Sequence, residues 1–366
     1  MKIIKIGEPK VIMSNPESKH SYFGWPTATR LQNGKIAVVA SGFRERHICP
    51  FGKTVISYSE NDGETYTMPA PVIDTVLDDR DGGITPFGES GVIVTSFNNT
   101  VDFQKRYSQK YGNAYDMAYL DRITPEEEKK ALGANFRISN DCGVTFGPIF
   151  KSPITSPHGP VELPDGTLLW VGRTFSKNNT KMGGFDGIQA HKINPDGSME
   201  FVGAIDNIEY EGKNPLSCEP HAIVLDDGTI LAHIRMEEPE IGMLTIYQSI
   251  SEDGGKTWTK PKQILSHCGG APPHLFKHSS GLLICTYGFR GEPYGQKPYG
   301  IKAMFSTDNG NTWDVGYSLY ETEISLDLGY PTTIELADKS MITVFYAVND
   351  DKENAVVLQQ KWSFEQ

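Results

Sequence analysis

The sequence predicts an all-β fold, a six-bladed β-propeller, with a small helical insertion. Two sequence repeats and a turn-rich composition carry this prediction. The chain has 366 residues, among them 37 Gly and 23 Pro, and abundant turn formers are typical of all-β proteins. A propeller of this length can be one domain, and no segment is long or polar enough to act as a linker. We therefore expect a single domain over residues 1–366.

The first repeat is a hairpin made of a strand, a turn that contains Gly or Asp, and a second apolar strand. Its copies lie at 29–39, 87–94, 161–171, 218–235, 275–284 and 334–344. A supersecondary unit that recurs along a chain indicates a repeat architecture. Six copies predict six blades.

The second repeat reads Ser-x-Asp/Asn-x-Gly-x-Thr-aromatic and runs in phase with the hairpins. It occurs at 59–66, 139–146, 251–258 and 306–313, and 194–201 is a candidate for a degenerate fifth copy. The acidic or amide side chain can cap backbone N–H groups, Gly takes positive φ, and the aromatic ring fills the blade. The pattern predicts hairpin tips, which specify a fold and not an activity.

The elements follow in order. Residues 3–6 predict a strand that pairs with a final strand near 355–362 and removes an open edge. The blades are expected at 22–68, from 80 onward, at 156–203, 216–260, 270–315 and 326–364. Blade 2 carries an insertion at 100–133. There Thr124, Pro125, Glu127 and Gly133 predict a short, capped helix. The insertion could roof the channel mouth or join subunits of a homo-oligomer, and the sequence leaves both open.

Composition excludes several classes of partner. A net charge of −12 argues against nucleic acids and anionic membranes. No apolar run reaches membrane-spanning length and the first ten residues lack the apolar block of a signal peptide, so we expect a cytoplasmic protein unless a leader was removed. The five scattered cysteines fit reduced thiols. No Cys or His pair has zinc-ligand spacing and no phosphate loop is present, so we expect neither a metal nor a cofactor.

Polar residues gather where a propeller exposes one mouth of its channel, at the starts of inner strands and in the loops after second strands. The inner-strand starts supply Trp25, Asp81, His158, Glu219, His221, His274, Asp327 and Tyr330, and the loops supply Arg44, Arg46, His47, Arg173, Arg235, Arg290 and Glu292. Arginine is the side chain best suited to hold a planar carboxylate. The set predicts a site for an anionic or polyhydroxylated ligand, and structural pairing with Asp81, Glu219 and Asp327 is the alternative.

The hairpin at 218–235 shows how two charged residues come to lie at one edge of a blade. Its turn at 226–228 brings Glu219 and Arg235 to the same edge of the sheet. Standing alone, they would be an ordinary surface ion pair. In phase with five other hairpins, they face the predicted channel.

The second repeat resembles the Asp-box, or bacterial neuraminidase repeat, of the sialidase superfamily, whose fold is a six-bladed β-propeller. This resemblance covers nearly the whole chain. Glu219 and Arg235 are similar to a family Glu and Arg at the same spacing, and 329–336 looks like the family segment that carries a tyrosine. The resemblance implies Tyr330 as nucleophile, Glu219 as its base, and Arg235 with Arg290 as an anion clamp. A neutral tyrosine suits an anomeric carbon that bears a carboxylate.

Two positions depart from the family. Its first arginine lies in a Phe-Arg-Ile-Pro motif, but this chain has Gly24 there, and Arg44 or Arg46 could take over its role. The family's acid/base Asp lies in the blade 1 loop, where this chain offers His47. His47 could act as the general acid near neutral pH, although Arg46 beside it favours the neutral ring.

The other candidates are assigned to substrate binding with a structural alternative for each. Trp25 could stack on a sugar face or plug the channel. Arg173 and Asp81 complete the polar rim. Each of His158, His221 and His274 could be a structural hydrogen bonder, whereas three on one rim favour polar contacts to a ligand.

The sequence as a whole predicts a sialidase-like exo-acting glycoside hydrolase that takes a terminal acidic sugar from a small oligosaccharide. One alternative is a non-catalytic glycan-binding propeller. Another is a sister carbohydrate-active enzyme, a different glycosidase or a lyase. A proton donor over the site would favour an enzyme, and an empty rim would favour a binder.

Overall fold

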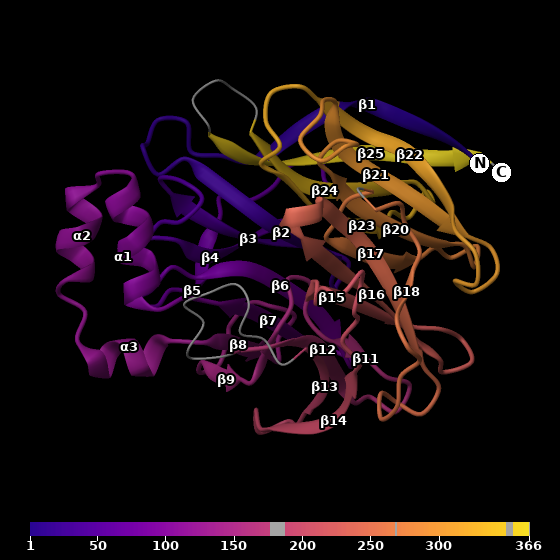
Figure 1. The fold of residues 1–366 in the computed structure, drawn as a ribbon, viewed down its shortest axis with the longest axis horizontal. Coiled ribbons are helices and arrows are strands. Elements are labelled where there is room, and N and C mark those ends of the chain that lie inside the picture. Colours follow the sequence, from indigo (N-terminus) through magenta and orange to yellow (C-terminus); the bar gives the residue numbers. More distant parts are fainter. Residues whose placement is uncertain (176–186, 268, 349–353, 366) are drawn as a thin grey trace.

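The computed structural model forms six antiparallel sheets set around a central channel, and it describes residues 1–175, 187–267, 269–348 and 354–365 (Figure 1). Five sheets have four strands, and the sheet of blade 3 has five. In four of these sheets every pair of neighbouring strands is consecutive in sequence, which is the arrangement of propeller blades. The predicted six-bladed propeller is confirmed.

The first three blades each run outward from the channel. Blade 1 contains β2 (Tyr22–Arg30), β3 (Ile36–Arg44), β4 (Lys53–Ser59) and β5 (Ala70–Ile73). Blade 2 contains β6 (Arg80–Phe87), β7 (Gly91–Phe97), β8 (Ala134–Ser139) and β9 (Phe150–Ser152). Blade 3 contains β10 (Ile154–Thr155), β11 (Val161–Glu162), β12 (Leu168–Thr174), β13 (Ile188–Ile193) and β14 (Met199–Ile205).

The other three blades complete the ring. Blade 4 contains β15 (Leu216–Val224), β16 (Ile230–Glu238), the 3-10 turn η1 (Pro239–Ile241), β17 (Met243–Ser251) and β18 (Lys262–Gln263). Blade 5 contains β19 (Pro273–Lys277), β20 (Leu283–Phe289), β21 (Tyr299–Ser306) and β22 (Asp314–Thr322). Blade 6 contains β23 (Leu328–Glu335), β24 (Met341–Val348), β25 (Ala355–Glu365) and β1 (Lys2–Met13).

Both ends of the chain contribute to blade 6. Strand β1 pairs antiparallel with β25, with Ile3 opposite Phe364 and Lys5 opposite Trp362, and the two termini lie side by side (Figure 1). The last blade therefore consists of three C-terminal strands and one N-terminal strand. This pairing joins the two ends of the ring and covers the outer edge of β25.

The four Ser-x-Asp/Asn-x-Gly-x-Thr-aromatic loops join the third and fourth strands of blades 1, 2, 4 and 5. In blade 4, the Gly255 N–H donates to Ser251 Oγ at 2.9 Å and the Thr257 N–H donates to Asp253 Oδ1 at 2.9 Å. The hydroxyl and the N–H of Thr257, with the Ser251 hydroxyl, hold the pKa of Asp253 down at about 2, the Thr257 hydroxyl contributing most. Each loop thus closes on itself through local hydrogen bonds.

The apolar core is divided among the interfaces between blades. One large cluster joins blades 5 and 6 through residues such as Ile301, Phe305, Phe345 and Trp362, and a second joins blades 3 and 4. Each blade therefore buries its faces against its neighbours, as stacked repeats require.

Three helices fill the insertion between β7 and β8: α1 (Val101–Lys110), α2 (Ala114–Leu120) and α3 (Pro125–Ala131). The predicted capped helix is α3, whose Thr124 and Glu127 form the reciprocal capping box. Helices α1 and α2 were not predicted, although Thr100 and Asn113 cap them. The helices lie together at one side of the ring (Figure 1). Within the described ranges, no helix is long and apolar enough to cross a membrane.

The cysteines that the structure describes are free. Cys49, Cys218 and Cys285 are buried, and Cys142 is partly exposed. Cys268 lies outside the described residues. Burial raises the pKa of Cys218 to about 12, so this thiol next to Glu219 stays protonated.

Candidate active site

Four inner strands begin with the same backbone distortion. Trp25, Asp81, Glu219 and Tyr330 have φ values of 53°, 47°, 48° and 51°, and each lies where the pairing register of its strand shifts. Such values are costly for non-glycine residues and tend to occur at functional sites. A β-bulge changes the direction in which a side chain points. The repeated bulge brings these four side chains to one mouth of the channel.

That mouth is a pocket of about 420 Å³, within the range of small-molecule sites. Most of the predicted rim residues line it: Trp25, His47, Asp81, Arg173, Glu219, Arg235, Arg290, Asp327 and Tyr330. They come from all six blades. The structure therefore joins most of the predicted rim into one site.

Tyr330, Glu219 and Arg235 form a chain of short contacts in the pocket. The Tyr330 phenol donates to Glu219 Oε1 at 2.5 Å, and Arg235 Nη1 donates to Glu219 Oε2 at 2.7 Å. Burial, the largest single effect, would raise the pKa of Glu219, but Arg235, the Tyr330 hydrogen bond and Arg173 together outweigh it and lower the net pKa. Burial and the nearby Glu219 raise the pKa of Tyr330 well above its usual value. Glu219 is thus a carboxylate placed to take the proton of a neutral phenol, as nucleophilic catalysis requires.

Arg235 and Arg290 differ in the partners that hold them. Arg235 also donates through Nη2 to Glu237 Oε2 at 2.5 Å, so its charge is shared between two carboxylates. Arg290 donates to the backbone carbonyls of Leu326 and Leu328 at 3.2 and 3.1 Å. Carbonyl partners fix the Arg290 guanidinium without neutralising it, which leaves its charge available to an anion.

Asp81 is the buried carboxyl of the pocket. The residue is 6% exposed, and within the described part of the chain Oδ1 has no hydrogen-bond partner. Burial raises the pKa of Asp81 to about 7, and Glu219 adds to the rise while Arg80 opposes it. A carboxyl group that holds a proton near neutral pH, in a pocket beside a nucleophile, is a candidate general acid.

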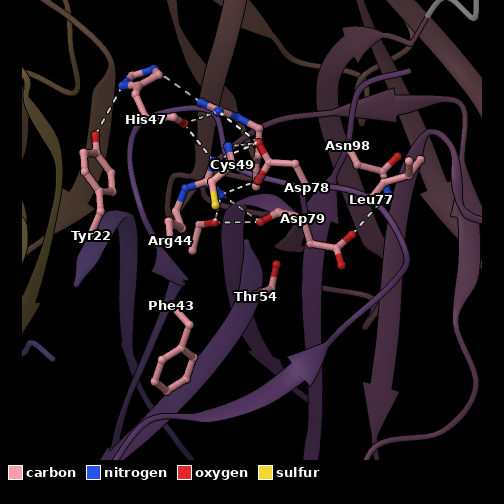
Figure 2. A network of polar contacts seen from close by, with 12 residues as sticks. Tyr22, Phe43, Arg44, His47, Cys49, Thr54, Leu77, Asp78, Asp79 and Asn98 are labelled. Carbon is pink, nitrogen blue, oxygen red and sulfur yellow. Dashed lines mark hydrogen bonds and ion pairs between the residues drawn. The ribbon is translucent and has the colours of Figure 1, made fainter. Parts of the chain in front are cut away.

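His47 lies at the edge of the pocket. Its Nδ1 is 3.2 Å from the Tyr22 hydroxyl and 3.4 Å from Asp327 Oδ1, and Figure 2 shows the contact with Tyr22. The enclosure of part of the ring, whose side chain stays 50% exposed, lowers the pKa of His47, with a further contribution from Arg80, while Asp327 opposes. His47 is therefore a neutral ring at pH 7 and a weaker proton donor than the sequence suggested.

The structure does not bring Arg44 or Arg46 into the pocket, which corrects the expectation that one of them replaces the missing arginine. Arg44 is fully buried, with its guanidinium 4.8 Å from the Trp25 ring centroid. Its Nη1 lies 2.5 Å from Asp78 Oδ1 (Figure 2). Arg46 forms an ion pair with Asp116 of α2. Both arginines meet a buried carboxylate that comes from a later segment, and this pairing turns them away from the channel.

Arg80 lines the pocket, where the sequence predicted Arg44 or Arg46. Its guanidinium lies 4.1 Å from the Trp25 ring centroid and its Nη1 donates to the His47 carbonyl at 2.7 Å. Strict alternation along β6 would turn either Arg80 or Asp81 away from the channel, and the bulge allows both to reach it. Other lining residues that the sequence did not reveal are Glu237, Tyr346, Phe103, Tyr107 and Tyr294.

The three rim histidines do not share this pocket, which corrects a second expectation. His158, His221 and His274 line another pocket, of about 470 Å³, with the lower parts of the inner strands. His221 follows Glu219 by two residues on β15, and two residues advance a strand by about 6.6 Å. His221, and the two histidines that share its pocket, therefore lie further along the channel than Glu219.

Comparison with known proteins identifies the fold but not the activity. The chain matches no family model, and no curated protein sequence matches it significantly. A Dyadobacter fermentans protein of unknown function is similar in structure, with 17% identity, 99% of both chains covered and a TM-score of 0.73. An intramolecular trans-sialidase from Ruminococcus gnavus, solved with oseltamivir carboxylate, has 12% identity, 97% of both chains covered and a TM-score of 0.63.

An α-L-arabinanase from Penicillium chrysogenum, solved with arabinobiose, has 12% identity, 98% of both chains covered and a TM-score of 0.60. Identities this low establish a shared fold and not a shared activity. The fold of this chain is the six-bladed propeller seen in sialidases and in related glycosidases, as the hairpin repeats predicted.

Proposed function

We propose that this protein is an exo-acting glycoside hydrolase that removes a terminal acidic sugar from a small glycan. The observation that carries the proposal is the chain of contacts from the Tyr330 phenol through Glu219 to Arg235. It supplies a nucleophile, a base within hydrogen-bond reach and a cation that keeps the base ionised.

In the proposed reaction, Tyr330 Oη attacks the anomeric carbon while Glu219 takes the phenol proton. The bond from the anomeric carbon to the leaving oxygen breaks, and that oxygen receives the proton of Asp81. Water then adds to the anomeric carbon of the glycosyl-enzyme as Asp81 removes its proton, and the Tyr330 oxygen leaves with the proton that Glu219 held. Two displacements at one carbon give net retention. Asp81 here fills the acid role for which the sequence suggested His47.

Several features support an acidic sugar as substrate. A neutral tyrosine is a suitable nucleophile where a carboxylate on the substrate would repel Asp or Glu. Arg80, Arg173 and Arg290 line the pocket beside Arg235, and arginine is well suited to bind a carboxylate. The volume of about 420 Å³ suits a ligand of one or two sugar residues.

The test is fluorophore release from 4-methylumbelliferyl glycosides, with a sialoside, a glucuronide and an α-L-arabinofuranoside in the panel. We expect wild-type protein to release the fluorophore from an acidic glycoside, and Tyr330→Phe and Glu219→Gln to abolish this release. Tyr66→Phe is the matched control, because Tyr66 lies in a hairpin tip outside the pocket. Its hydroxyl donates a hydrogen bond to Gln359 Oε1.

Two outcomes would count against the proposal. If no glycoside is cleaved while an acidic sugar raises the melting temperature, the protein is a glycan-binding propeller. If the product is an unsaturated sugar, the pocket performs elimination, and the protein is a lyase on the same scaffold.

A further inference from the structure

The opposite end of the channel holds a second cluster of polar side chains. The pocket of about 470 Å³ there is walled by inner strands, and His158, His221 and His274 meet in it. Their ring centroids lie 4.5 to 5.2 Å apart, and the rings of His221 and His274 stack at 14°. Three imidazoles so close would suggest a metal site. Among the described residues, however, no group of three or more His, Cys, Asp or Glu is placed to hold a metal ion.

The hydrogen bonds on the wall side of two rings explain why. The backbone N–H of Leu275 donates to His221 Nδ1 at 2.9 Å, and the backbone N–H of Thr333 donates to His274 Nδ1 at 3.3 Å. A ring nitrogen that accepts a hydrogen bond carries no proton, so the proton of each neutral ring is on Nε2. Both rings therefore offer an N–H donor, and neither Nε2 has a lone pair for a metal.

His158 has the opposite tautomer. Its Nδ1 lies 3.2 Å from Thr27 Oγ1, and this hydroxyl donates its one proton to the Pro157 carbonyl at 2.9 Å. His158 Nδ1 is then the donor, which leaves Nε2 as an acceptor. The residue is 2% exposed, and Nε2 has no partner in the described part of the chain. Burial lowers the pKa of His158 to about 3 and keeps the ring neutral.

Two donor rings within 5.2 Å of one acceptor ring match the bonding capacity of a single hydroxyl group. A hydroxyl oxygen can accept two hydrogen bonds and donate one. The charges at the rim of this pocket balance, with Arg30 and Lys277 opposing Glu162 and Glu335, so they favour a ligand without net charge. Phe276 adds an aromatic wall, and the volume suits a sugar.

We propose that the histidine trio is a second binding site that takes a neutral sugar and holds one of its hydroxyl groups at the end of the channel opposite Glu219. The site does not depend on the glycosidase proposal. It would anchor a neutral glycan on one face of the propeller while the other face acts on, or binds, an acidic terminus.

The test is histidine-selective ¹⁵N NMR of the full-length protein. We expect protonated Nε2 in His221 and His274 and unprotonated Nε2 in His158. Methyl glycosides of glucose, galactose and mannose would be titrated separately, and at least one should shift all three signals saturably. His267, in the loop after blade 4, is an internal control that should not move.

Glu219→Gln should leave this titration unchanged, whereas His158→Phe should abolish the shifts of His221 and His274. Protonated Nδ1 in His221 or His274 would overturn the donor assignment. Wild-type signals that stay fixed up to the solubility of all three sugars would also overturn the proposal and assign the position to a water molecule. The wild-type titration decides even if His158→Phe does not fold.

Discussion

The Tyr330 hydroxyl lies 2.5 Å from Glu219 Oε1, although 111 positions separate the two residues in the chain. The contact crosses the channel from blade 6 to blade 4. Both residues have positive φ, which costs about 1–3 kcal/mol for each. A costly backbone that points two side chains at one another is typical of a preorganised reaction centre.

This contact gives the first prediction. Tyr330→Phe keeps the ring but removes the nucleophilic oxygen, so kcat/KM should fall at least about 100-fold. Steady-state kinetics on the acidic glycoside that the panel identifies will measure the loss. The melting temperature should change little, and a rate loss that only tracks unfolding would contradict the assignment.

The pKa of Asp81 predicts the pH dependence of activity. As general acid, Asp81 must be protonated, and its pKa is about 7, so kcat/KM should fall as the pH rises above about 7. Asp81→Asn should lower the rate and abolish this alkaline limb. A limb that persists in Asp81→Asn would assign the titration to another group, with His47 the next to test.

The same carboxyl group should affect stability with a defined sign. Its folded pKa of about 7 exceeds the unfolded value of about 3.9. The folded state therefore binds more protons than the unfolded state in this range, and the free energy of unfolding falls as the pH rises from about 4 to about 7. Asp81→Asn should therefore unfold at a higher denaturant concentration than wild type at pH 8. Equal midpoints at pH 8 would show that burial does not hold the proton on Asp81.

The buried ion pair of Arg44 and Asp78 gives a test of the scaffold behind the pocket. Arg44 is 0% exposed, and removing one partner of a buried pair leaves an uncompensated charge. Arg44→Met should lower the free energy of unfolding by about 3–5 kcal/mol. Lys53→Met is the control, since its pair with Asp74 is exposed and should be worth less than about 1 kcal/mol. Urea titration will separate the two.

The hairpin tips predict a loss of stability in acid. Hydrogen bonds within each loop hold the pKa of Asp141 and of Asp253 at about 2. The largest contribution comes from the Ser139 hydroxyl for Asp141 and from the Thr257 hydroxyl for Asp253. A depressed carboxyl pKa stabilises the fold above the unfolded value of about 3.9, and this contribution is lost as the pH falls toward 2. Asp141→Asn/Asp253→Asn should weaken the dependence of melting temperature on pH between about 4 and 2. An unchanged slope would contradict this.

The repeats made much of the fold predictable, because they are local. A hairpin tip such as 251–258 satisfies its own hydrogen bonds, so its sequence alone indicates its conformation. The blade number and the positions of Glu219, Arg235 and Tyr330 at one mouth follow from counting such units along the chain.

Only the tertiary structure decided which arginines line the pocket and which histidines line the second pocket instead. The sequence predicted Arg44 at the rim, but Arg44 is held in the interior by Asp78, whereas Arg80, which also lies 3.6 Å from Asp78, reaches the pocket. Ion-pair choice depends on which carboxylate a distant segment brings near, and no local pattern records it. The bulges act in the same way: one extra residue reverses the face on which side chains point, which brings Asp81 to the pocket with Arg80. The sequence alone determined the blades and the meeting of Tyr330 with Glu219 at one mouth, while packing between blades determined the burial of Asp81, the arginines that line the pocket and the separate position of the histidine trio.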